Sequence, residues 1–138
     1  MMAQVNDDQI REMLRRYHRI AVVGLSDRPD RPSYDVAAYL KDAGYEITPV
    51  NPQIEEWHGI PSVASLREVS PPVEIVDVFR RPDAVPEVVE EAIAVGAKVV
   101  WLQLGIVHEA AAEKARAAGI VVVQDRCLKV EHRRLLGG

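Results

Sequence analysis

The chain has a single cysteine, Cys127, among its 138 residues. One cysteine excludes an internal disulfide framework and fits a reducing compartment. Residues 1–8 are polar and acidic, so they lack the apolar segment of a secretory signal peptide. We therefore expect a cytoplasmic protein.

The chain also lacks a basic excess and any long apolar run. Its formal net charge is −4, whereas nucleic acids and anionic membranes attract proteins with a surplus of Lys and Arg. No apolar segment approaches the roughly 20 residues that span a bilayer. We expect a soluble protein with a small-molecule partner, no nucleic-acid partner and no membrane partner. The sequence leaves a protein partner unknown.

Aromatic residues make up only 5% of the chain, while 48% of the residues are apolar. The core must therefore consist mainly of Val, Ile, Leu and Ala. A chain of this length is a normal size for one domain. We expect a single domain over residues 1–138, with its core at about residues 18–125 and flanking helices at residues 7–17 and 126–136.

Short apolar runs alternate with segments of helical periodicity along the chain. Strands are predicted at residues 20–23, 45–50, 73–79, 98–104 and 120–124. Helices are predicted at residues 7–17, 34–43, 82–95, 108–118 and 126–136, the first capped by Asp7-Asp8 and the second by Ser33. Residues 61–68 are predicted to form at most a short helical turn. Continuously apolar strands are typical of a parallel sheet buried on both faces. The fold class is therefore α/β, with a single Rossmann-like doubly wound domain whose mainly parallel sheet is flanked by helices.

The first predicted strand leads into a Gly24-Leu-Ser26 turn, and a helix begins within ten residues. This is the front end of a nucleotide-binding βαβ unit, in which backbone N–H groups bind phosphate. The turn is not G-x-G-x-x-G, however, and the second strand ends in Asn51-Pro52 rather than in the acidic residue that binds the ribose of NAD. The sequence thus indicates a nucleotide site without the nicotinamide fingerprint.

Several polar and cationic residues follow the predicted strands, where open parallel sheets bind their ligands. They are Gly24, Leu25, Ser26, Arg28, Asn51, Pro52, Arg80, Arg81, Pro82, Gln103, Gly105, Ile106, Asp125, Arg126 and Cys127. Arginine side chains at such an edge suit a ligand with several phosphates. Three of these features have a purely structural alternative. Gly24 could simply form a tight turn, Asn51-Pro52 an ordinary turn, and Arg80-Arg81 a solvated loop.

No set of catalytic residues stands out. His18, His58, His108 and His132 show no metal-ligand spacing, so no metal site is expected. Trp57 and Trp101 are interpreted as packing residues, and Cys127 as a small buried hydrophobe. Without a nucleophile–base pair, the rim favours a binding module over an enzyme.

Taken in order, these segments resemble the small stand-alone CoA-binding proteins, which are related to the CoA-binding domain of the succinyl-CoA synthetase alpha subunit. The resemblance covers about residues 10–136. It is carried by Val23-Gly-Leu-Ser26, Arg31-Pro-Ser-Tyr34, Gly44-Tyr45, Pro49-Val-Asn-Pro52, Phe79-Arg-Arg-Pro82, Gly96-Ala-Lys98, Val100-Trp-Leu-Gln-Leu-Gly-Ile106, Ala118-Gly119 and Val123-Gln-Asp-Arg-Cys127.

The resemblance implies a site for coenzyme A or an acyl-CoA at the strand ends. Gly24, Leu25 and Ser26 would meet the phosphates, Val50, Asn51 and Pro52 the adenosine, and Phe79, Arg80, Arg81 and Pro82 would close over the nucleotide. Gln103, Gly105 and Ile106 would line the exit towards the pantetheine thiol, and Arg28, Ser33 and Tyr34 complete the expected set. The synthetases carry a Lys soon after the position of Pro52 and tend to carry a carboxylate where Gln103 stands. Candidates for the 3′-phosphate are therefore Arg28, Arg31, Arg80 and Arg81.

The chain also ends before the phosphorylated-histidine domain that the synthetases need, so ligase activity is not expected of it alone. The leading hypothesis is a CoA or acyl-CoA binding protein without catalytic activity of its own. The alternatives are an NAD(P)-binding Rossmann oxidoreductase, the CoA-binding subunit of a split acyl-CoA synthetase, and a sensing scaffold that uses Cys127.

Overall fold

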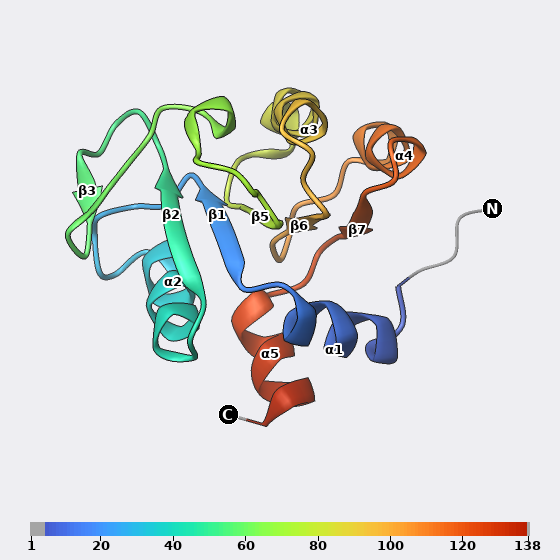
Figure 1. Ribbon diagram of the computed structural model, residues 1–138, viewed down its shortest axis with the longest axis horizontal. Coiled ribbons are helices and arrows are strands. Elements are labelled where there is room, and N and C mark those ends of the chain that lie inside the picture. Colours follow the sequence, from blue (N-terminus) through green and yellow to red (C-terminus); the bar gives the residue numbers. More distant parts are fainter. Residues whose placement is uncertain (1–4, 138) are drawn as a thin grey trace.

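Five parallel strands form the centre of the fold, in the order β2-β1-β5-β6-β7 (Figure 1). They are β1 (Arg19–Val23), β2 (Glu46–Val50), β5 (Ile75–Val78), β6 (Val99–Leu102) and β7 (Val121–Val123). The computed structural model describes residues 5–137. The chain runs from β1 outward to β2, crosses back to β5, and then proceeds in the opposite direction to β7. This reversal is the switch point of a doubly wound sheet, and it confirms the predicted Rossmann-like α/β fold.

Helices cover both faces of the sheet. α1 (Asp7–Arg16), α2 (Pro32–Asp42) and α5 (Leu128–Leu136) lie on one face, and α3 (Val85–Ala94) and α4 (Glu109–Ala117) lie on the other (Figure 1). Short 3₁₀ turns, η1 (Leu66–Glu68) and η2 (Pro82–Ala84), precede α3. A small hairpin of β3 (Glu56–Trp57) and β4 (Ile60–Pro61) follows β2.

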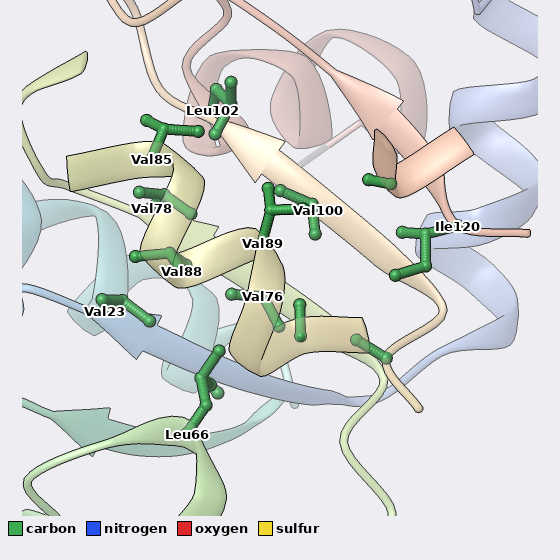
Figure 2. Close-up of a cluster of buried hydrophobic side chains, with 14 of the residues drawn as sticks. Val23, Leu66, Val76, Val78, Val85, Val88, Val89, Val100, Leu102 and Ile120 are labelled. Atoms are coloured by element: carbon green, nitrogen blue, oxygen red, sulfur yellow. The ribbon is translucent and has the colours of Figure 1, made fainter. Parts of the chain in front are cut away.

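Alternating strand residues supply two separate cores. In β1, Ala21 and Val23 face α3 and α4, whereas Ile20 and Val22 face α1, α2 and α5. Figure 2 shows the first core, where Val85, Val88 and Val89 of α3 pack on the sheet. Both faces are apolar, as the continuous apolar runs predicted.

The structure moves several predicted boundaries. The first helix is capped by Asn6 and not by Asp7-Asp8: the Asn6 side chain accepts a hydrogen bond from Gln9 N, and the Gln9 side chain accepts one from Asn6 N. Asp7 and Asp8 occupy the first turn instead, where carboxylates favour the positive end of the helix. The β3–β4 hairpin was not predicted. Its residue Trp57 is buried, in agreement with the packing role expected from the sequence.

The prediction that Ser33 caps α2 is wrong. The helix begins at Pro32, with Arg31 at the N-cap position and no side-chain cap, because proline has a fixed φ that suits the first helical residue and needs no N–H partner there. The Ser33 hydroxyl lies inside the first turn, nearly buried, and accepts a hydrogen bond from Ser26 N at 3.0 Å. Ser33 therefore fastens the turn after β1 to α2.

Within residues 5–137, no helix combines the length and the apolar character needed to cross a membrane.

Candidate functional site

The ends of the three strands β2, β1 and β5 are tied together by backbone hydrogen bonds. Gly24 N donates to the Val50 carbonyl at 2.9 Å, and Phe79 N donates to the Val23 carbonyl at 2.8 Å. The parallel ladder thus continues one residue past β1 and β5. Gly24, Asn51 and Phe79 are held as neighbours at the switch point, where ligands of open α/β sheets bind.

Gly24 lies close to the loop that follows β5. Its φ is +87°, and a Cβ atom built on it would lie 2.5 Å from the Phe79 carbonyl oxygen and 3.2 Å from Arg80 Cδ. Such a Cβ contact with backbone is impossible without displacement. A glycine is therefore required here by both the backbone angle and the available space.

A cleft of about 470 Å³ opens at this point, on the face of the sheet that carries α3. It lies within the roughly 300–1,000 Å³ range of small-molecule sites. Six of the expected site residues line it: Gly24, Val50, Asn51, Pro52, Phe79 and Arg80. These six residues come from the ends of three different strands, β1, β2 and β5.

The other lining residues were not predicted. They are Val23, Gln53, Ala64, Ser65, Glu87, Val88 and Glu91. Glu87 and Glu91 are one helical turn apart in α3, and Glu91 Oε1 accepts a hydrogen bond from Leu66 N at 3.2 Å. An i, i+4 pair of carboxylates in the helix that follows Arg80-Arg81 is the signal that could have found them.

Several expected residues lie on the α2 side of the switch point and do not line the cleft. They are Leu25, Ser26, Arg28, Ser33 and Tyr34. Leu25 is fully buried, so its side chain is a core residue and only its backbone faces the rim. Ser26 Oγ accepts a hydrogen bond from Arg28 N, which shapes the turn itself.

The Asn51 side chain is committed to the protein at both ends. Its Nδ2 donates to the Leu25 carbonyl at 3.0 Å, and its Oδ1 accepts from Gln53 N at 2.9 Å. The amide thus ties the loop after β2 to the turn after β1. It has the position of the ribose-binding acidic residue in NAD proteins but forms the wall of the site instead.

The two adjacent arginines have different surroundings. Arg80 lines the cleft, with its Cδ close to Gly24. Arg81 is 89% exposed, and its Nε lies 3.9 Å from Asp83 Oδ1. Pro82 begins η2 and does not line the cleft. Both side chains are exposed, and of the two only Arg80 lines the cleft.

Gln103, Gly105 and Ile106 follow β6, next along the same edge of the sheet, outside the cleft lining. Gly105 N donates to Asp125 Oδ1 at 2.6 Å, which links this loop to the one after β7. Gln103 is nearly buried, and its Nε2 donates to Asp77 Oδ1 at 2.6 Å. Asp77 is completely buried in β5, and burial raises the pKa of its carboxyl to about 7. Asp77, an acidic residue near the centre of the predicted strand 73–79, was the signal for this pair and was not recognised in the sequence.

His58 and Cys127 lie outside the cleft. The His58 ring stacks on Trp57 at a centroid distance of 4.1 Å, and its Nε2 is 2.9 Å from the Tyr34 hydroxyl. Cys127 is half-buried at the N-cap of α5, and so more exposed than the buried hydrophobe expected from the sequence. In the described part of the chain, no three His, Cys, Asp or Glu side chains are grouped as metal ligands would be.

Comparison with known proteins identifies a family and several similar proteins. The family model described as a CoA binding domain matches residues 18–133. The uncharacterized protein YneT of Bacillus subtilis is 50% identical over 124 residues, which are 90% of this chain and 92% of that protein. A hypothetical protein from Pyrococcus horikoshii has a TM-score of 0.94 at 41% identity, with 99% of each chain covered. A Thermus thermophilus protein has a TM-score of 0.89 at 46% identity, with 95% of this chain and 99% of that chain covered.

Proposed function

This chain belongs to the CoA-binding domain family, and on that premise we propose that it binds coenzyme A or an acyl-CoA at the carboxyl edge of its sheet, without catalysing a reaction by itself. The observation that carries the proposal is the cleft at the switch point, which joins Gly24, Asn51, Phe79 and Arg80 in one cavity. A site of this volume accommodates the nucleotide half of coenzyme A.

The charges around the cleft give the ligand an orientation. Glu87 and Glu91 line the α3 side of the cavity and repel phosphates. The neutral adenine base therefore lies on that side, where carboxylates accept hydrogen bonds from its amino group. The phosphates lie towards Arg80 and the Gly24-Leu25-Ser26 turn, close to the N-terminal end of α2.

The same geometry argues against a nicotinamide dinucleotide. Asn51 stands where a NAD protein carries the carboxylate for the ribose diol, and its amide nitrogen and oxygen each already form one hydrogen bond within the protein. A neutral amide also binds a diol more weakly than a carboxylate, whose hydrogen bonds are charge-assisted. We therefore expect coenzyme A to bind more tightly than NAD or ATP.

Isothermal titration calorimetry with coenzyme A, NAD and ATP tests the proposal. Tighter binding of coenzyme A than of either other nucleotide supports it, and equal or tighter binding of NAD overturns it. Native mass spectrometry of freshly purified protein is the companion measurement, because a retained ligand would be identified by its mass as free coenzyme A or a particular acyl-CoA.

The absence of catalysis has its own test. His58 and Cys127 are the groups with the chemistry to act on a thioester, and neither lines the cleft. Acetyl-CoA and succinyl-CoA incubated with the protein, with and without a nucleoside triphosphate and free acid, should be recovered unchanged by chromatography. Turnover that disappears in His58→Ala or Cys127→Ser would make the protein an enzyme.

A further inference from the structure

Asp77 is an acidic residue in the middle of an apolar sheet. It lies in β5, between Val22 of β1 and Trp101 of β6 in the strand register. Its side chain is completely buried, whereas its neighbours in β5 are all aliphatic. A buried carboxyl group costs free energy unless hydrogen bonds compensate for its lost hydration. Packing alone therefore does not account for an acidic residue at this position.

The Asp77 carboxyl has one hydrogen-bond partner among the described residues. Its Oδ1 accepts from Gln103 Nε2 at 2.6 Å, and its Oδ2 is buried without any partner. The Gln103 amide thus turns its NH₂ group towards Asp77, whose Oδ1 is the acceptor. The side-chain oxygen of Gln103 is then directed away from Asp77.

The Gln103 oxygen reaches the rim of the sheet. Gln103 directly follows the last residue of β6. Within residues 5–137, the buried side-chain polar atoms without a partner are Trp57 Nε1 and Asp77 Oδ2. Gln103 Oε1 is not among them, and it accepts no hydrogen bond from another described residue, so it keeps contact with solvent at the carboxyl edge.

The direction of the ligand along this edge follows from what blocks the other side. Beyond β2, Asn51 N donates to the Val63 carbonyl, and Val63 pairs with Val50, so the loop containing the hairpin covers that end of the sheet. For a coenzyme A whose nucleotide half fills the cleft, the direction over β5 and β6 is therefore the one left open to the pantetheine arm. Gln103 is the residue at the end of β6.

We propose that Asp77 is a positioning residue, which holds the Gln103 amide so that Oε1 accepts a hydrogen bond from an amide N–H of the pantetheine arm. The inference rests on the proposed function. This role explains why the protein contains a buried acid at a cost in free energy. Without Asp77, the Gln103 amide could rotate and present either its oxygen or its nitrogen to the ligand. The fixed amide favours a donor on the ligand and disfavours an acceptor at the same place.

Two ligands separate this role from a merely structural one. Coenzyme A carries the pantetheine arm, and adenosine 3′,5′-bisphosphate carries only the nucleotide half. In Asp77→Val the glutamine loses its anchor, and coenzyme A should bind roughly three- to tenfold more weakly, as expected for one lost hydrogen bond. Binding of the bisphosphate should change by less than about twofold, because this ligand has no pantetheine arm and loses no hydrogen bond in the variant.

Three further variants complete the experiment. Asp77→Asn keeps an acceptor oxygen of the same shape but adds an N–H donor, so it holds Gln103 in either orientation and should bind coenzyme A with an affinity between those of wild type and Asp77→Val. Gln103→Leu should lose coenzyme A affinity as Asp77→Val does, and the double variant Asp77→Val/Gln103→Leu should lose no more than either. Gln103→Leu alone carries the test if Asp77→Val does not fold.

Each outcome has one meaning. Equal losses for the two ligands, or unchanged coenzyme A binding in Asp77→Val and Gln103→Leu, overturn the positioning role while the proposed function stands. A wild-type protein that binds neither ligand overturns the proposed function, and the positioning role with it. Selective loss for coenzyme A in Asp77→Val and Gln103→Leu, with a smaller loss in Asp77→Asn, is the expected result.

Discussion

The turn at Gly24 and the carbonyl of Phe79 meet so closely that a Cβ atom on residue 24 would lie 2.5 Å from the Phe79 oxygen. The two residues belong to the adjacent strands β1 and β5 at the switch point. The sequence attributed the glycine to close approach of a phosphate. The structure gives a reason internal to the fold, because the neighbouring loop already fills the space.

Changing Gly24 to Ala should therefore destabilise the protein even without ligand. The added methyl group collides with backbone, and a φ of +87° is unfavourable for any residue with a Cβ. We expect the free energy of unfolding, measured by urea denaturation, to fall by at least about 2 kcal/mol.

Gly59→Ala is the matched control. Gly59 also has a positive φ, +76°, but a Cβ there would meet nothing within 4 Å. Its loss should be limited to the backbone cost, about 1–2 kcal/mol. Equal losses in the two variants would show that the contact with Phe79 relaxes freely.

Arg80 and Arg81 should contribute unequally to ligand binding. Arg80 lines the cleft, whereas Arg81 is directed to solvent beside Asp83. Arg80→Ala should weaken coenzyme A binding by roughly three- to thirtyfold, the range for a partly exposed charge-assisted hydrogen bond. Arg81→Ala serves as the control and should leave the dissociation constant within about twofold, because the Arg81 side chain lies outside the cleft and its charge is screened by water and salt.

The salt dependence of binding distinguishes a lost contact between Arg80 and phosphate from a change in the fold of the variant. The difference between wild type and Arg80→Ala in calorimetry should shrink as the salt concentration rises. A difference that is independent of salt, or an equal loss in Arg81→Ala, would contradict the assignment of Arg80 to the phosphates.

Glu131 should stabilise the docking of α5 on α1. Its side chain is 10% exposed and accepts hydrogen bonds from Arg126 and Arg134, and Arg134 also binds Asp7 of α1. These arginines, Arg134 foremost, lower the pKa of the Glu131 carboxyl. A lowered pKa gives stability that is present above the unfolded value and is lost as the pH falls through the folded pKa.

We therefore expect Glu131→Gln to lower the free energy of unfolding by roughly 1–2 kcal/mol near neutral pH. The difference from wild type should vanish in acid, below the folded pKa of Glu131. Glu90→Gln is the control, since Glu90 pairs with Lys114 on an open surface and both side chains are more than half exposed. A loss in Glu90→Gln as large as that in Glu131→Gln would indicate a general charge effect.

The order of strands and helices was predictable because the buried strands are mainly short apolar runs, continuous in β6 and β7, and a glycine or a polar turn separates each run from the next helix. Gly44, for example, has the positive φ expected of a residue that ends a helix. Boundaries were less predictable, since competing caps lie within a residue or two. Ser33 has the chemistry of an N-cap, yet Pro32 begins the helix and the serine hydroxyl binds Ser26 N instead.

The part of the site contributed by strand ends was also predictable, since carboxyl ends of parallel strands converge by topology. The proximity of Gly24, Asn51 and Phe79 follows from the order of the strands, without any knowledge of side-chain packing. Glu87 and Glu91 were missed because they enter the cleft from the side of a helix, which depends on how α3 rotates over the sheet. Asp77 was missed because its partner, Gln103, is distant in sequence and only the strand pairing brings the two together.

The buried Asp77 carboxyl should make stability fall as the pH rises from about 4 to about 7. Burial raises the pKa of Asp77 from 3.8 to about 7, so the folded state holds a proton that the unfolded state releases. The resulting stability is fully present below the unfolded pKa and is lost as the pH rises through the folded pKa. The full shift corresponds to on the order of 4 kcal/mol, but His132, whose pKa burial lowers, acts in the opposite sense.

Comparison with Asp77→Asn isolates the Asp77 contribution, because the asparagine has the same shape and does not titrate, while His132 is unchanged. We expect the stability of wild type relative to Asp77→Asn, measured by urea unfolding at several pH values, to decrease over that range and to level off above it. Asp83→Asn removes an exposed carboxylate and should follow wild type. A wild-type minus Asp77→Asn difference that stays constant with pH would mean that Asp77 titrates in the folded protein as it does in the unfolded chain, and the buried, partnerless oxygen would then require a cation or another donor beside it.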